Sequence, residues 1–500
     1  MNTDSGDAFA ASRECFDALC TELGEDATGE LEHSELEARL ESKGRELLRL
    51  LMQDHLDLRA VREQRLPEVR DAEQVAHSAV ETSHQRHLAT IFGEIEVSRL
   101  AYRARGTENL YPADAVLNLP AERHSHGLRR LAALEAARGS YQDTVDAIAR
   151  ASGQRLGKRQ AEGLAQRAAV DFDAFYATRQ APAGASNDDL LVLSCDGKGV
   201  VMRPDALRPD TARAAAAAIP KLASRLSRGE KRNRKRMAEL GAVYDATPAV
   251  RSPNDILHAP GEQRAEPAPA PVTDNKWLTA SIVTDAAGVV GQIFDEAERR
   301  DPHHARTWIA LVDGNKHQID RITAEACQRQ VTVTILIDFI HVLEYLWKAA
   351  WCFHAEGDRA VEEWIANKAR AILAGKATRV AGAIRRQATT AGLSANRRAG
   401  ADTCATYLTN KAAHLDYPTA LANGRPIATG IIEGACRHIV ADRLDITGAR
   451  WGLAGAEAIL KLRALRSNGD FNEYFSFHLA QERRRIHETR YADAAIPIAA

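Results

Sequence analysis

Several features that mark particular classes of protein are scarce or missing in this chain. Aromatic residues make up only 5% of its 500 residues, and its seven cysteines are an odd number in which no two have C-x-x-C spacing. A disulfide framework or a cysteine-based zinc site is therefore not expected. No apolar run approaches the ~20 residues that cross a bilayer, and the polar, acidic N-terminus does not resemble a signal peptide. We therefore expect a soluble protein of the reducing cytoplasm with no membrane association.

The charge balance also lacks a dominant sign, since the formal net charge is -2 at pH 7. Bulk charge therefore gives no indication of nucleic-acid binding, and such a function has to depend on local basic patches. The chain is too long for one ordinary core, so we expect several domains. A hydrophobic share of 45% is typical of a globular protein, and the abundance of alanine favours helix.

Three acidic residues stand at comparable places in separate segments. Asp196 and Asp313 each follow an apolar run and precede a glycine, and Glu433 opens a segment with a helical pattern. Carboxylates that converge from two strands and a helix can hold a pair of divalent cations, which is chemistry for cutting and joining phosphodiesters. Each residue also has a plainer interpretation on its own, as a turn aspartate or as a glutamate at a helix start.

The elements expected around these residues have the order of a ribonuclease-H-like fold, in which three antiparallel strands precede parallel strands with helical crossovers. The sequence predicts strands at 190–194, 199–202 and 238–244, a helix at about 277–300, a strand at 308–312, a helix at about 318–329 and a strand at 331–337. We therefore expect an α+β multidomain protein. Its ribonuclease-H-like core has a large helical insertion and is preceded by helical and helix-turn-helix DNA-binding regions.

The predicted segments are a helical region at 1–87, a small β module at 88–125, a helix-turn-helix-like domain at 126–178, the core in two parts at 189–347 and 426–475, a helical insertion at 348–425 and a basic tail at 476–500. The first segment is expected to be mostly helical from residue 8 to about residue 85. It carries leucines at 36, 40, 47, 51 and 58, which share one helical face. This stripe is typical of a packed helical hairpin or of a dimerising arm.

Basic side chains suited to a phosphate backbone occur in two places. The second helix of the helix-turn-helix candidate carries Lys158 and Arg159, although an ordinary helical pair with a solvated basic face has the same pattern. The most basic run of the chain, 225–236, is either a solvated loop or a clamp on a DNA backbone. Its candidates for DNA contact are Arg228, Lys231, Arg232, Arg234, Lys235 and Arg236.

Taken together, several motifs resemble those of bacterial insertion-sequence transposases of the DDE type, most closely the ISKra-type group, with kinship to the Mutator-like superfamily. The motifs are SCDGKGV at 194–200, LVDG at 311–314, IDFIHVLEYLW at 337–347, and GIIEG at 430–434 followed by DRL at 442–444 and GARW at 448–451. The resemblance covers most of the chain from residue 90 onward. It implies a nucleoid-associated cytoplasmic enzyme that binds the terminal inverted repeats of an insertion sequence and catalyses DNA cleavage and strand transfer.

The resemblance also implies site residues, a cofactor and partners. Asp196, Asp313 and Glu433 would be the catalytic residues and would bind Mg²⁺, for which Mn²⁺ can substitute. Double-stranded DNA, from the element ends and the target, would be the substrate of a homo-oligomer. The D-x-x-H element of Mutator-like enzymes reads here as Asp338 to His341, so Asp338 stays open as the alternative second ligand, with Asp313 favoured by the order of elements.

Further residues near these motifs are candidates for supporting roles. Arg437 follows Glu433 by one helical turn and would either face the same groove or pair with that glutamate. His341 lies beside apolar Val342 and Leu343, where a histidine is ordinarily a core residue, and a tryptophan such as Trp451 is more often part of the core than a platform for base stacking. Candidates for DNA contact in the last motif are Arg443, Arg450 and Trp451.

Two other functions are compatible with these residues. A transposase-derived DNA-binding protein without catalytic activity is one, and the presence of all three carboxylates counts against it. A nuclease of the same fold that never joins strands is the other, and an assay with a pre-cut 3′-hydroxyl end separates it from a transposase.

Overall fold

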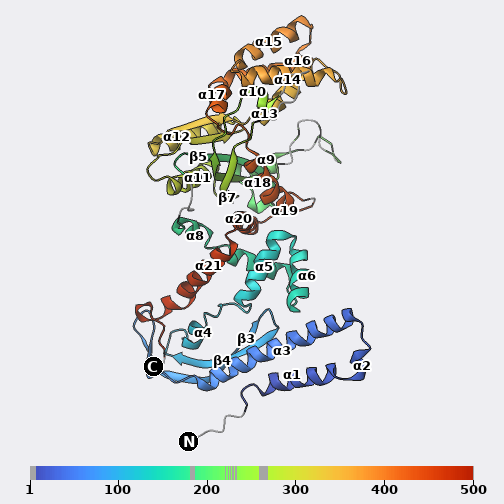
Figure 1. Cartoon of the computed structure of the whole chain (residues 1–500). Coiled ribbons are helices and arrows are strands. Elements are labelled where there is room, and N and C mark those ends of the chain that lie inside the picture. The colour runs from blue at the N-terminus through green and yellow to red at the C-terminus, as the bar shows by residue number, and fades with distance from the viewer. Residues whose placement is uncertain are drawn as a thin grey trace. The chain divides into compact units, whose positions relative to one another are not determined.

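The computed structural model describes residues 7–180, 186–219, 221–222, 224–225, 227, 230, 233–257, 268–446 and 448–498. The chain forms two compact units (Figure 1). Unit 1 combines Met1–Thr178 with Gly469–Ala500, and unit 2 is Arg179–Asn468. Helices and strands both occur in each unit, so the general α+β class is confirmed. Within the described ranges, no helix has the length and apolar character needed to span a membrane.

The N-terminal part of unit 1 packs helices on a β-hairpin. It contains α1 (Ala10–Leu23), α2 (Asp26–Gly29), α3 (His33–Arg62), the short strands β1 (Val69–Arg70) and β2 (Ala76–His77), and the hairpin of β3 (Ala79–Ala89) and β4 (Glu94–Arg103). Leu56 of α3 packs with Leu88 and Ile95 of the hairpin. Residues 8 to about 85 are helical as far as Arg62, and strands replace the predicted helix beyond it, so the predicted hairpin is present but begins at Ala79 and not near residue 88. Because β3 is mostly polar and exposed, its sequence shows no clear period-two alternation.

The rest of unit 1 is helical. It contains α4 (Pro112–Val116), α5 (His126–Arg138), α6 (Tyr141–Ser152), α7 (Lys158–Ala168), α8 (Phe172–Thr178) and α21 (Phe471–Ile486). The two helices predicted on either side of a glycine turn are confirmed as α6 and α7. Ser140 caps α6, and Gly153 ends it with a φ of +69°, a left-handed conformation that glycine adopts without steric cost. The segment predicted as a basic tail, 476–500, begins inside the helix α21, which ends at Ile486.

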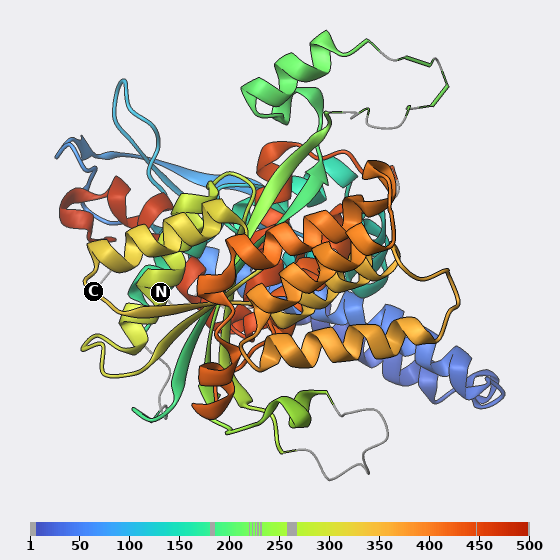
Figure 2. The same cartoon turned by 90° about the horizontal axis from the view of Figure 1, so that it is seen from above.

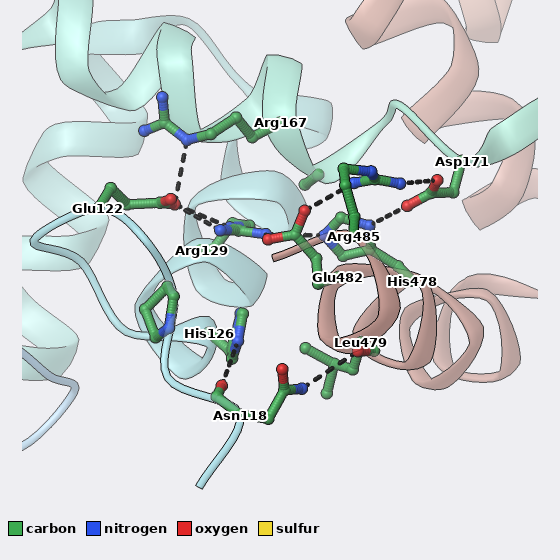
Figure 3. Close-up of polar contacts among 12 residues, drawn as sticks. Asn118, Glu122, His126, Arg129, Arg167, Asp171, His478, Leu479, Glu482 and Arg485 are labelled. Carbon is green, nitrogen blue, oxygen red and sulfur yellow. Dashed lines mark hydrogen bonds and ion pairs between the residues drawn. The ribbon is translucent and has the colours of Figure 1, made fainter. Parts of the chain in front are cut away.

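A buried polar cluster holds α21 within unit 1 (Figure 3). Arg129 of α5 is completely buried, and its Nη1 donates to Glu482 Oε2 at 2.7 Å and to His478 Nε2 at 2.9 Å. The same guanidinium donates from Nε to Glu122 at 3.1 Å. His478 Nδ1 lies 2.7 Å from Asp171 Oδ2. Since Nε2 accepts from a guanidinium and Nδ1 donates to a carboxylate, His478 is neutral with its proton on Nδ1.

Beside this cluster, His126 gives unit 1 a pH-dependent stability. Its Nε2 donates to the Asn118 carbonyl at 2.8 Å, and burial, with the nearby Arg129 charge, lowers its pKa from 6.5 to about 4. The unfolded chain therefore takes up a proton first as the pH falls. The contribution to stability is complete above pH 6.5 and is lost between pH 6.5 and about 4.

We expect unit 1 to lose about 2 kcal/mol of unfolding free energy between pH 7.5 and pH 5 through His126 alone. Thermal unfolding followed by far-UV circular dichroism at the two pH values measures this loss. His126→Asn keeps a donor for the Asn118 carbonyl but does not titrate, so it should reduce the difference. Equal pH sensitivity in the variant would contradict the assignment to His126.

Unit 2 is built on a mixed five-stranded sheet whose strand order is β7-β6-β5-β8-β9. The strands are β5 (Leu190–Val201), β6 (Lys235–Thr247), β7 (Val272–Ser281), β8 (Trp308–Val312) and β9 (Val333–Ile337). β5, β6 and β7 pair antiparallel, and β8 and β9 continue the sheet from β5 in parallel. The parallel strands are joined by α12 (Lys316–Gln328), and α11 (Ala286–Arg300) precedes β8.

The three antiparallel strands differ from their predicted positions. The segments predicted as first and second strands are one continuous strand, β5, which passes through Asp196 and Gly197. The predicted third strand is β6. The third antiparallel strand of the sheet is β7, whose last five residues were predicted as the start of the helix at about 277–300 and whose first five were not assigned to any element. Its five C-terminal residues are buried, whereas its first five are exposed or half-buried.

Different helices cover the two faces of this sheet. Cys195 and Gly241 are paired across β5 and β6, and a Cβ on Gly241 would lie only 2.6 Å from Ile293 Cγ1 of α11. Glycine at 241 therefore allows α11 to lie close to the sheet. Side chains alternate along a strand, so Asp196, next to Cys195, points to the opposite face.

That opposite face meets the C-terminal helices of unit 2. These are α18 (Gly430–Ala435), a π-helical turn at Cys436–Ala441, α19 (Asp442–Leu444) and α20 (Leu453–Asn468). Between β9 and α18 lie α13 (Phe339–Ala350), α14 (Ala360–Leu373), α15 (Ala377–Thr390), α16 (Ala395–Asn410) and α17 (Tyr417–Ala422). Figure 2 shows much of this helical layer in orange beside the sheet. The loops of β5–β6 and β6–β7 carry α9 (Pro209–Ala217) and α10 (Pro253–Ile256).

Candidate functional site

Asp196 lies in the middle of β5 and is half-buried on the face covered by α18. Its Oδ1 accepts a hydrogen bond from the Gly197 amide at 2.6 Å, and its Oδ2 accepts one from Cys436 Sγ at 3.1 Å. Burial raises the pKa of the Cys436 thiol, and the Asp196 carboxylate raises it further. Cys436 therefore stays protonated and donates to Asp196.

The register of the sheet brings Asp196, Asp313 and Asp338 to one level. Ser194 of β5 is paired with Leu311 of β8. Asp196, two residues after Ser194, therefore comes level with Asp313, two residues after Leu311. Val312 is likewise paired with Ile337 of β9, so Asp313 is level with Asp338. Neighbouring strands lie about 4.8 Å apart, and residues level with each other point to the same face. The three aspartates thus form a row across β5, β8 and β9.

Asp313 directly follows β8 in a turn that the adjoining glycine makes possible. Its Oδ1 accepts from the Asn315 amide at 2.7 Å, and its carbonyl accepts from the Tyr407 hydroxyl of α16 at 2.8 Å. Gly314 has a φ of +88°, and a Cβ there would lie 2.8 Å from that same hydroxyl. A larger residue would therefore displace Tyr407 from its contact with Asp313.

Asp338 is fully buried, and both of its carboxylate oxygens are engaged by backbone groups. Oδ1 accepts from the Ile340 amide at 2.6 Å and so caps α13. Oδ2 accepts from the Thr429 amide at 2.7 Å and from the Thr429 hydroxyl. Asp338 therefore joins the start of α13 to Thr429, the residue that precedes α18.

Glu433 lies on α18, where its side chain is 44% exposed. Its Oε1 is 3.8 Å from His341 Nε2, and His341 Nδ1 is 3.9 Å from Glu344 Oε2. Partial burial raises the pKa of Glu433, and the charges of Asp338, Glu344 and Asp196 raise it further, while His341 opposes them. Glu433 thus lies in the same acidic neighbourhood as Asp196, with His341 as the basic group beside it.

The structure therefore brings the predicted residues into one neighbourhood, but their side chains are not arranged around a common centre. Within the described ranges, no group of three or more His, Cys, Asp and Glu side chains is arranged to hold a metal ion. The donors still suit a hard cation, since Asp196, Asp313 and Glu433 offer carboxylate oxygens and none of them is fully buried. These three carboxylates are therefore the candidates for holding a divalent cation such as Mg²⁺.

The residues near the last sequence motif differ in their availability. Arg437 is 84% exposed, and its Nε is 4.0 Å from Asp442, so the predicted alternative of pairing with Glu433 does not apply. Arg443 and Trp451 are 3% and 6% exposed, with the guanidinium 4.7 Å from the indole ring. These two side chains therefore pack on each other in the interior, and their contact with DNA stays a prediction.

A cavity of about 740 Å³ lies where the end of β5 meets the start of β6. Arg234 and Lys235 line it from the start of β6, and Arg450 lines it from the other side. Arg236 instead donates to the Ile282 carbonyl at 2.7 Å. The predicted contacts Arg228, Lys231 and Arg232 lie outside the described residues. In unit 1, Lys158 and Arg159 are exposed on the first turn of α7.

Three residues that the sequence did not single out belong to this site. Cys436 follows Glu433 by three positions, a spacing that places both on one side of a helix and could have indicated it. Tyr407 contacts Asp313 across 94 positions, and Thr429 contacts Asp338 across 91. Contacts of such long range leave no local pattern in the sequence.

Comparison of the chain with models of protein families and with curated proteins found no match. The functional interpretation therefore depends on the geometry of the site and on the motifs of the chain.

Proposed function

We propose that the protein is a DNA transposase whose unit 2 is a ribonuclease-H-like catalytic core. The observation that carries the proposal is that the register of the parallel strands β5 and β8 brings Asp196 level with Asp313, the residue that follows β8, with the helix of Glu433 packed over the Asp196 face. Three antiparallel strands followed by two parallel ones, in the order β7-β6-β5-β8-β9, are the arrangement expected of such a core.

In this proposal Asp196, Asp313 and Glu433 hold divalent cations, with Mg²⁺ as the natural ion and Mn²⁺ as a substitute. Bound cations would activate the attacking oxygen and stabilise the leaving oxygen at phosphorus. The chain itself contributes the positions of the ligands. β5 and β8 fix the two aspartates, and Tyr407 fixes the turn after Asp313. His341 partly balances the negative charge around Glu433.

The substrate in this proposal is double-stranded DNA, from the terminal repeats of an insertion sequence and from a target. Arg234, Lys235 and Arg450 line one cavity of unit 2, and such side chains neutralise phosphates without reading sequence. Lys158 and Arg159, at the start of the second helix of a helix-turn-helix, are suited to the terminal repeats. We also propose that the protein acts as a homo-oligomer in the cytoplasm, where it is associated with the nucleoid.

A strand-transfer assay tests the proposal. The substrate is DNA from either end of the segment that carries the gene, pre-cut to leave a 3′-hydroxyl, together with a supercoiled target and Mg²⁺. We expect joined products with the wild-type chain, and Asp196→Asn should reduce their rate at least ~10³-fold, because losing a metal ligand removes several kcal/mol of transition-state stabilisation. Asp188→Asn, an exposed carboxylate just before β5, is the matched control and should keep full activity.

The other outcomes of this assay point to other functions. Cleavage of uncut DNA without any joining would identify a nuclease of the same fold. Specific binding of the DNA ends with neither cleavage nor joining, in Mg²⁺ and in Mn²⁺, would identify a DNA-binding protein that lacks catalytic activity.

A further inference from the structure

The long helix α3 presents an apolar face that the rest of unit 1 does not cover. Leu40, Leu48 and Leu51 are 39%, 47% and 40% exposed, although α3 packs on the hairpin through Leu56. At 3.6 residues per turn, Leu40 and Leu51 lie in one line with the half-buried Leu47 and Leu58. We call these residues, with Leu36 and Leu48, the leucine stripe. It extends over 22 positions (58 − 36 = 22), or about 33 Å of helix.

The charges along one flank of the leucine stripe change sign halfway. Glu37 and Glu41 lie on this flank in the N-terminal half of α3, and His55 and Arg59 lie on it in the C-terminal half. Glu37 and His55, like Glu41 and Arg59, are 18 positions apart, which is five full turns, so all four share the flank. The side chains of Glu37 and Glu41 are 70% and 67% exposed, and their ion pairs are with neighbours on the same helix.

The other flank of the leucine stripe is already covered. There Arg39 and Lys43 of α3 lie 2.9 and 3.8 Å from Glu22 of α1. Further along, buried Asp54 accepts from the Ser12 amide of α1 at 3.0 Å. A second helix can therefore approach the stripe only along the flank that carries Glu37, Glu41, His55 and Arg59.

We propose that the leucine stripe is a self-association surface, and that two copies of the chain pair through antiparallel α3 helices. In an antiparallel pair the same flank of each helix meets its counterpart in reverse order, so Glu37 and Glu41 come beside Arg59 and His55 of the partner subunit. Acidic and basic groups then face each other twice about a two-fold axis near Leu47 and Leu48. Parallel pairing would set the open flank against the one that α1 covers. This proposal does not depend on the function proposed for unit 2.

Sedimentation equilibrium of the full chain tests the surface. We expect a dimer at micromolar concentrations for the wild type and a monomer for Leu48→Glu with Leu51→Glu, with the dissociation constant raised about 100-fold or more, since two charges are placed at the centre of each contact face. Val170→Glu, a 56% exposed apolar residue elsewhere in unit 1, is the matched control and should not change association. Far-UV circular dichroism verifies that each variant is folded. A monomeric wild type at tens of micromolar, or an unchanged dimer of the leucine variant, would overturn the proposal.

A charge exchange tests the antiparallel arrangement independently. Glu37→Arg and Arg59→Glu should each weaken association about tenfold, because each places like charges together twice in the dimer. The double variant should restore association to within about threefold of the wild type. Residues 37 and 59 are about 33 Å apart along one helix, so they can compensate each other only between two copies. A double variant that associates more weakly than either single variant would overturn the antiparallel pairing.

Discussion

Asp313→Asn should abolish strand transfer, by about 10³-fold or more, and leave the stability of unit 2 nearly unchanged. The asparagine oxygen still accepts from the Asn315 amide, so the turn after β8 is kept while the anionic ligand is lost. Asp338→Ala, in contrast, should mainly lower the stability of unit 2. It removes the cap of α13 and leaves the buried Thr429 amide without an acceptor, which costs about 3 kcal/mol of unfolding free energy.

The measurement uses the distribution of tryptophan. All six tryptophans lie between positions 277 and 451, within unit 2, so fluorescence-detected unfolding reports on that unit. Thr429→Val provides a milder control, since it removes one donor to Asp338 and leaves the carboxylate in place. We expect this variant to be slightly less stable and still active. A Thr429→Val chain that is folded but inactive, together with an active Asp313→Asn chain, would move the ligand assignment to Asp338.

Arg129→Met should destabilise unit 1 by about 2–3 kcal/mol, because buried Glu482 and half-buried Glu122 each lose a charged hydrogen-bond donor and keep only one other guanidinium, that of Arg485 or Arg167. Arg129 is fully buried, and the side chain of Glu482, which it contacts, is 8% exposed. Glu122 and His478 lose a donor in the same variant. Hydrogen exchange of the α5 and α21 amides measures the loss, since these two helices supply Arg129, His478 and Glu482 (Figure 3).

Arg138→Met is the matched control on the same helix. Arg138 is 57% exposed and pairs with Glu135 one turn earlier, an arrangement that contributes only a few tenths of a kcal/mol. Its removal should leave exchange in α5 and α21 unchanged. If the two variants had equal effects, the buried cluster would not be what holds α21 in unit 1.

The sequence predicted the elements of unit 2 best where local patterns are strong. The buried β8 and the amphipathic α12 lie where apolar periodicity placed them. It failed at β5, where Asp196 and Gly197 look like a turn but continue a strand whose neighbour β6 supplies the pairing. It also failed at β7, whose exposed half lacks an apolar pattern. In both cases the structure is fixed by a distant strand and not by local propensity.

The candidate site shows the same division. The three carboxylates could be selected from their place after apolar runs and from the motifs around them. The separate role of Asp338 could not be predicted, because Asp338 follows a strand just as Asp313 does. What distinguishes Asp338 is its contact with Thr429, 91 positions away. The burial of Arg443 beside Trp451 could not be predicted for a similar reason. Their sequence shows a basic and an aromatic residue, and only packing reveals that they fill the interior together.

The tie between Asp338 and Thr429 has a consequence for how this chain can evolve. The Phe339 amide also donates to the Ile427 carbonyl at 2.9 Å, so the segment that forms the helical layer begins and ends at one place. Closure entropy grows only slowly with the length of such an excursion. Helices α14 and α15 can therefore lengthen, shorten or be exchanged between lineages while α18 keeps its starting point. The helical layer can therefore change in evolution while the sheet and α18 stay the same.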